Sequence, residues 1–270
     1  MNRKIVFRWL KIFVLVYATI GILIYYLQDY ILLHPEKLPA DYKFSFSQPF
    51  KELNIPYNAD SKMNIVQFKT TDSLIKGVVL YFHGNRENIN RYAAISPLVT
   101  KHGYEIWMLD YPGFGKSTGK FAEQVVYDWA LTFYKLARAR FTPDSIIIYG
   151  RSLGSGIASQ LASIRDCKRL ILETPYYSMP SVFDSYIPLY PFNKIIHYQF
   201  PTWQYLQKVD APVTIFHGED DGVIPLRNSN KLKRYQKRGD EFISIEDGSH
   251  NDLFKFPEYQ TKLDSVLNLP

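Results

Sequence analysis

The sequence predicts an α/β protein with a mostly parallel sheet flanked by helices, preceded by one N-terminal transmembrane helix. From residue 50 onward, short apolar runs alternate with segments of helical periodicity, which is typical of strands joined by helical crossovers. Residues 12–28 form an uncharged apolar run. The 270-residue length suits one large domain.

The strands and helices are expected at positions set by apolar periodicity. The run GVVLYF at 77–82 is continuously apolar, as in a strand buried on both faces. Strands are expected at 50–58, 63–71, 77–82, 105–111, 145–150, 168–174, 211–218 and 241–247. Helices are expected at 89–102, 121–140, 154–163 and 252–267. The chain thus divides into an N-terminal segment 1–30, a connector 31–49 and a domain 50–270.

The apolar run near the N-terminus predicts an uncleaved signal-anchor. Its 17 residues would span about 25 Å as a helix, the low end of a membrane crossing. Basic residues precede the run and acidic residues follow it, which favours a cytoplasmic N-terminus and a single-pass membrane protein. The domain would then lie on the far side, periplasmic or extracytoplasmic. A cleaved signal peptide and a buried core helix are the alternatives, but the run lacks a small-residue cleavage site and is apolar all round.

The charge of the chain gives no support to nucleic-acid binding. Of the net +6, residues 1–28 carry +4 from Arg3, Lys4, Arg8 and Lys11, which leaves +2 for the remainder, without a basic stripe. Cys167 is the single cysteine, so neither an intramolecular disulfide nor a cysteine metal cluster is expected. No metal or cofactor is expected.

A candidate nucleophile follows the strand at 145–150. The residues Gly150-Arg151-Ser152-Leu153-Gly154 form a G-x-S-x-G pattern between this strand and a helix. In this setting a strained turn exposes the serine hydroxyl, and the glycines prevent a collision of neighbouring Cβ atoms. The bare pattern arises by chance in roughly one chain in ten of this length, so the strand-turn-helix context carries the prediction.

A serine hydroxyl needs a base, and the base needs a carboxylate. His250 follows the last expected strand in the loop DGSHND. The strand at 211–218 leads into Glu219, Asp220 and Asp221, any of which is an acid at the correct sheet edge. The order serine, acid, histidine is the one expected for a nucleophile elbow. The oxyanion donors are expected to be the backbone N–H groups of Asn85 and Leu153.

These motifs resemble the α/β-hydrolase superfamily, in particular its membrane-anchored branch with a short lid. The likeness runs from about Leu53 to Leu267. Its marks are HGNREN, DYPGFGKSTG, GRSLGSG, APVTIFHGEDDGVIP and GSHND. The resemblance implies the α/β-hydrolase fold and selects Asp221 as the acid. Arg86 and Glu87 replace the small residues usual in the oxyanion loop.

The resemblance also implies a lid at about 175–210, a segment rich in aromatic residues. Tyr176, Tyr177 and Phe183 are the candidate substrate-pocket residues, although aromatics that merely pack on the sheet edge give the same pattern. The expected activity is hydrolysis of a carboxylic ester or thioester, with an acylated or lipid-like small molecule as substrate, through an acyl-serine intermediate. A peptidase or amidase, an acyltransferase and a non-catalytic membrane-anchored binding protein are the alternatives. Activity should fall as His250 becomes protonated below neutral pH.

Overall fold

An eight-stranded sheet forms the centre of the computed structural model. The structure describes residues 3–269. Met1 and Asn2 of the expected N-terminal segment and Pro270 of the expected domain lie outside the described residues. The strand order is β10-β9-β8-β7-β4-β6-β3-β2, and β3 alone among these strands runs against the others. The strands are β2 (Phe50–Pro56), β3 (Lys62–Phe68), β4 (Gly77–Phe82), β6 (Tyr104–Leu109), β7 (Ile146–Arg151), β8 (Arg169–Glu173), β9 (Val213–Gly218) and β10 (Glu241–Ile245).

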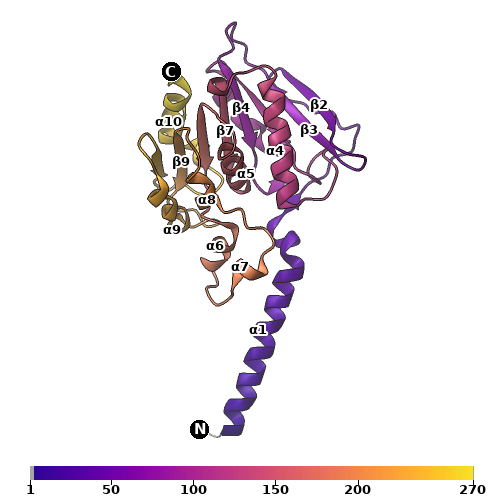
Figure 1. The fold of residues 1–270 in the computed structure, drawn as a ribbon, viewed down its shortest axis with the longest axis vertical. Helices are drawn as coiled ribbons and strands as arrows, with labels where there is room; N and C mark the ends of the chain where they lie inside the picture. The colour runs from indigo at the N-terminus through magenta and orange to yellow at the C-terminus, as the bar shows by residue number, and fades with distance from the viewer. Residues whose placement is uncertain (1–2, 270) are drawn as a thin grey trace.

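Helices cover both faces of this sheet (Figure 1). Alternate side chains of β4 enter two separate apolar clusters: Leu80 belongs to the cluster that contains Phe133 of α4, while Val79 belongs to the cluster that contains Leu263 of α10. This two-sided burial explains why the strand sequence is continuously apolar. The helices that form these layers are α2 (Ile89–Tyr92), α3 (Ser96–Thr100), α4 (Glu123–Arg138), α5 (Leu153–Ala162), α9 (Leu226–Ser229) and α10 (Pro257–Asn268). The fold is thus the expected α/β class with a mostly parallel sheet.

The prediction of a single helix at 89–102 was wrong. The segment is broken into α2, a 3₁₀ turn η1 (Ala93–Ile95) and α3, with Pro97 in the first turn of α3. Proline lacks an N–H and therefore favours the start of a helix over its interior. The last helix likewise begins at Pro257, after the short turn η4 (Leu253–Lys255), rather than at residue 252.

The lid segment between β8 and β9 contains three short helices. These are α6 (Met179–Asp184), α7 (Phe192–Ile195) and α8 (Thr202–Leu206). A reciprocal pair of hydrogen bonds between Ser178 and Ser181 caps the start of α6. Apolar side chains at 187 and 189, in the loop between α6 and α7, are largely exposed.

Helix α1 (Arg3–Leu32) projects from the domain as a long arm, with the N-terminus at its far end (Figure 1). It continues beyond the uncharged run and is long and apolar enough to span a membrane. Its domain-proximal half contacts the lid segment. Tyr17 stacks on Tyr190 with ring centroids 4.3 Å apart, and the Gln28 side chain accepts a hydrogen bond from the backbone N–H of His197.

Candidate active site

Ser152 lies at the sharp turn between β7 and α5. Its backbone adopts φ 50° and ψ −118°, a conformation that L-residues rarely occupy and that costs free energy unless the surroundings impose it. The backbone N–H of Ser152 donates to the carbonyl oxygen of Glu173 on the neighbouring strand at 2.9 Å. The side chain is 7% exposed, so the turn presents a mostly enclosed hydroxyl.

The glycines on either side of Ser152 are required by close packing. A Cβ at Gly150 would lie 2.4 Å from the carbonyl oxygen of Gly154, and a Cβ at Gly154 would lie 2.1 Å from the carbonyl oxygen of Phe82. Both contacts are with backbone, which cannot give way. The G-x-S-x-G spacing therefore follows from how closely α5 approaches β4.

The structure brings Ser152, His250 and Asp221 into one hydrogen-bonded chain. His250 Nδ1 lies 2.7 Å from Asp221 Oδ2, and His250 Nε2 lies 2.9 Å from Ser152 Oγ. With the Nδ1 proton donated to the carboxylate, Nε2 is free to accept the serine proton. The three side chains come from the ends of three different strands, and each residue is less than 10% exposed.

Asp221 is the buried member of the three acidic residues that follow β9, whereas Glu219 and Asp220 are exposed. Its Oδ1 accepts hydrogen bonds from the backbone N–H groups of Val223 and Ile224 at 2.8 and 2.7 Å. These bonds fix the carboxylate, which leaves Oδ2 directed at the imidazole. Local chain geometry after the turn thus distinguishes this acid from its neighbours.

A second imidazole, that of His217, lies behind Asp221. Its Nε2 is 2.8 Å from the carbonyl oxygen of Ile224 and 3.4 Å from Asp221 Oδ2. Burial lowers the pKa of His217 from its ordinary value, and the nearby Asp221 carboxylate only partly opposes this effect. The neutral ring donates to the Ile224 carbonyl and thereby helps to hold the turn that carries Asp221.

We expect the depressed pKa of His217 to make the protein less stable in mild acid. The unfolded chain takes up a proton on this ring near pH 6.5, while the folded chain does not, so stability is present above that pH and is lost as the pH falls. His217→Gln should show a smaller drop in thermal unfolding midpoint between pH 7 and pH 5 than the parent protein. Parallel drops in the two proteins would show that another group governs this range.

The loop after β4 lies beside Ser152. A Cβ at Gly84 would lie 3.6 Å from the Cβ of Ser152. Asn85 follows, and its side-chain Nδ2 donates to the carbonyl oxygen of Leu32, the last residue of α1, at 2.6 Å. Leu153 is the first residue of α5, and a first-turn N–H has no acceptor within its own helix.

A short strap of chain after α1 holds this loop. Strand β1 (His34–Pro35) pairs in parallel with β5 (Arg86–Glu87), and the backbone N–H of His34 donates to the carbonyl oxygen of Asn85 at 2.9 Å. Glu87 has a φ of 57°, a strained left-handed conformation for a non-glycine residue. The residues that replace the usual small ones in this loop thus form a two-residue strand against the strap that follows α1.

Replacement of Asn85 by alanine should impair turnover because it releases the loop from α1. Loss of one partly buried hydrogen bond that positions a backbone donor is expected to lower kcat for a p-nitrophenyl ester about tenfold. Asn90→Ala is the matched control, because Asn90 is exposed and, within the described chain, its side chain bonds to the Tyr42 hydroxyl alone. Equal kcat values for both variants would contradict a positioning role for the Asn85 side chain.

A hollow of about 250 Å³ opens beside Ser152. Residues from α1, the strap, the loop after β4 and the His250 loop border it: Ile31, His34, Gly84, Asn85, Arg86, Arg91, Tyr92, Ser152, Val223, His250 and Asn251. A neighbouring hollow of about 280 Å³ shares Arg91, Tyr92 and Asn251. Ile31 and His34 were not predicted from the sequence as site residues, because no motif in the connector 31–49 indicates that it lies beside the active site.

The candidate pocket residues from the lid segment do not border this hollow. Tyr176 is buried behind the turn, where its hydroxyl donates to the carbonyl oxygen of Leu153 at 3.0 Å. Tyr177 stacks on Trp203, and Phe183 packs on Phe192. Their assignment to a substrate pocket stays a prediction.

A buried polar cluster supports the turn from below. The Glu173 carboxylate accepts hydrogen bonds from the hydroxyls of Tyr149 and Tyr259 at 2.5 and 3.0 Å, and it pairs with the Arg151 guanidinium at 3.2 Å. Arg151 precedes the serine, so this cluster fixes the residue before the nucleophile. The cluster was missed because its members are far apart in sequence.

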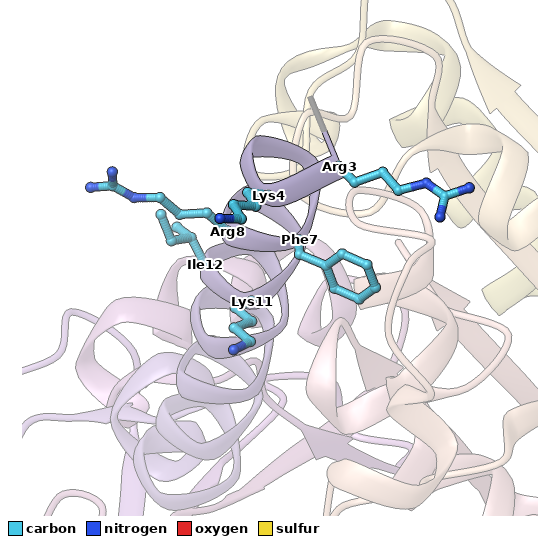
Figure 2. Close-up of a pocket in the computed structure, with 6 residues that line it drawn as sticks. All are labelled: Arg3, Lys4, Phe7, Arg8, Lys11 and Ile12. Atoms are coloured by element: carbon cyan, nitrogen blue, oxygen red, sulfur yellow. The ribbon is translucent and has the colours of Figure 1, made fainter. Parts of the chain in front are cut away.

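A basic hollow also lies along the far end of α1 (Figure 2). All the residues that border this hollow belong to α1, and Figure 2 shows the side chains of Arg3 and Arg8 pointing away from this helix in opposite directions. One helix cannot enclose a ligand. These side chains instead form the basic flank of the apolar run, suited to anionic headgroups.

Comparison with known proteins shows that this chain is similar to hydrolases. A family model described as serine aminopeptidase, S33 matches residues 74–208, half of the chain. The α/β hydrolase domain-containing protein 17C of Xenopus tropicalis is 31% identical over 196 residues, covering 70% of this chain and 61% of that protein. The lysophosphatidylserine lipase ABHD12 of Danio rerio is 28% identical over 232 residues, covering 72% of this chain and 58% of that protein. The chain thus spans about three fifths of the length of these relatives.

Solved structures share the fold at low sequence identity. The Pyrococcus furiosus esterase Pf2001 has a TM-score of 0.66 at 17% identity, with 87% of this chain and 98% of that chain covered. A soluble variant of the Saccharomyces cerevisiae monoglyceride lipase has a TM-score of 0.64 at 17% identity, with 86% and 98% covered. At this identity the likeness concerns the fold.

Proposed function

Because this chain belongs to the α/β-hydrolase superfamily, we propose that it is a serine hydrolase that cleaves carboxylic esters or thioesters through an acyl-serine intermediate. The observation that carries the proposal is the hydrogen-bonded chain from Asp221 through His250 to Ser152. A binding protein of the same fold has no need for this chain.

Each side chain has a step in this proposal. His250 Nε2 accepts the Ser152 proton as Oγ attacks the substrate carbonyl, and Asp221 stabilises the imidazolium that results. The N–H groups of Asn85 and Leu153 are proposed to hold the oxyanion. His250 then gives that proton to the departing oxygen or sulfur as its bond to the acyl carbon breaks, which releases the alcohol or thiol. Water attacks the acyl-serine while His250 takes its proton, and His250 returns the proton to Oγ as the bond between Oγ and the acyl carbon breaks and the acid leaves.

We propose an acylated amphiphile as the substrate, presented by a membrane. Ile31 and His34, at the end of the apolar helix, border the hollow beside Ser152, so the site opens where α1 would leave a bilayer. The activities named for two similar proteins, a lysophosphatidylserine lipase and a monoglyceride lipase, agree with such a substrate. The positive-inside rule places the catalytic domain on the extracytoplasmic side.

Trapping the covalent intermediate tests the mechanism. The full-length protein in detergent, mixed with a p-nitrophenyl ester and quenched in acid, should show a burst of p-nitrophenol and one acyl group on the peptide that contains Ser152. A series of esters, thioesters and anilides of increasing chain length then separates esterase from amidase and measures the acyl pocket. Added glycerol reveals an acyltransferase. Turnover without an adduct on Ser152, and without a burst, would contradict the proposal.

A further inference from the structure

The hollow beside Ser152 has a cationic wall. Arg86 and Arg91 border it together with the imidazoles of His34 and His250, and no carboxylate is among its described bordering residues. A ligand in this hollow therefore lies beside two arginine residues and beside no carboxylate among the described bordering residues. The proposed function needs a carbonyl site here and does not by itself require positive charge.

The two arginines differ in how far their charges are already neutralised. Arg91 forms an ion pair through Nη1 with Glu87, four residues earlier in β5. Arg86 is exposed, and within residues 3–269 no ion pair to its side chain is found. A guanidinium has five N–H donors, so Arg91 also retains donors beyond the one that Glu87 uses.

The neighbouring Arg151 provides a comparison, because its charge is neutralised by an ion pair within the protein. Its guanidinium is partly buried and pairs with Glu173, and it also lies within reach of the His250 carbonyl and the Asn251 side chain. Arg151 therefore supports the turn. Among the residues that the structure describes, the Arg86 side chain has no such ion-pair partner, although its backbone lies in the strand that the strap holds.

We propose that Arg86, assisted by Arg91, forms a subsite for an anionic group, a carboxylate or a phosphate, on the substrate of Ser152. This inference rests on the proposed function and narrows it to anionic acyl amphiphiles. Arginine binds both kinds of anion through paired N–H donors. Because the hollow holds only about 250 Å³, the anion lies close to the ester that Ser152 attacks.

Two matched substrate pairs test the subsite on either side of the ester. 1-Oleoylglycerol and 1-oleoylglycerol 3-phosphate differ in one phosphate on the alcohol side, and p-nitrophenyl butyrate and p-nitrophenyl hemisuccinate differ in one carboxylate on the acyl side. The full-length protein is assayed in non-ionic detergent micelles, with oleate or p-nitrophenol as the measured product. We expect kcat/KM to favour the anionic member of at least one pair.

Arg86→Gln should lower that anionic-to-neutral ratio about tenfold, as for the loss of one charge-assisted hydrogen bond. The ratio cancels any general damage to the adjoining loop. Arg86→Lys keeps the charge and should retain the larger part of the ratio. Arg165→Gln, an exposed arginine beyond the C-terminal end of α5, is the matched control and should leave the ratio unchanged.

The outcomes separate this inference from the proposed function. Ser152-dependent hydrolysis with ratios near one in both pairs, or a ratio that Arg86→Gln does not change, would overturn the anionic subsite and leave the hydrolase standing. The absence of Ser152-dependent hydrolysis of all four substrates would overturn both.

Discussion

Ser152→Ala is expected to abolish covalent labelling by a fluorophosphonate probe and to reduce ester hydrolysis to about a thousandth or less. The probe phosphonylates a serine whose proton is taken up by a base, and Ser152 is the serine that lies 2.9 Å from His250 Nε2. Labelling is read by in-gel fluorescence on the full-length protein in detergent. Hydrolysis is read from initial rates with p-nitrophenyl butyrate.

Ser163→Ala is the matched control, because this serine ends the same helix and its hydroxyl bonds only to the carbonyl oxygen of Gln160. It should label and turn over as the parent protein does. Persistent labelling of a folded Ser152→Ala protein, or equal loss in both variants, would refute Ser152 as the nucleophile.

Asp221→Asn should lower kcat about ten-thousandfold with little change in KM. An amide nitrogen facing His250 Nδ1 favours the tautomer with the proton on Nε2, so the ring no longer accepts the serine proton. The amide oxygen retains the two backbone hydrogen bonds now made by Oδ1, so the turn is expected to persist. Initial rates across substrate concentration give the two parameters separately.

Asp220→Asn provides the control, since the neighbouring carboxylate is exposed. Its kcat should match that of the parent. A larger loss for Asp220→Asn than for Asp221→Asn would reassign the acid and would also question the selection of Asp221 by resemblance.

The sequence was most informative where a single local signal determines structure. β4 occupies the predicted 77–82, because continuous apolar residues bounded by glycines permit few alternatives. The turn at Ser152 could likewise be placed, since backbone crowding demands glycine at Gly150 and Gly154. The rule that parallel strands end at one edge brought Ser152, His250 and one of the three acids after β9 together, and the family resemblance selected Asp221 among those acids.

Features that depend on distant pairing could not be predicted in this way. β1 and β5 have two residues each, too few for any periodicity to appear. Their pairing depends on where α1 ends, and the end of α1 is held by contacts of Gln28 and Asp29 with the lid segment. The cluster around Glu173 depends on Tyr149 and Tyr259, which are remote in the chain.

The contacts between α1 and the rest of the chain have a mechanical consequence. A domain that is joined to one membrane helix by a flexible linker can change its orientation relative to that helix freely. Here Tyr17 and Leu32 are both attached, one to Tyr190 and the other to Asn85, over about 22 Å of helix. If α1 crosses a bilayer, it is therefore a rigid connection between the bilayer and the domain. Any tilt of α1 that the bilayer thickness imposes then rotates the hollow beside Ser152 through the same angle.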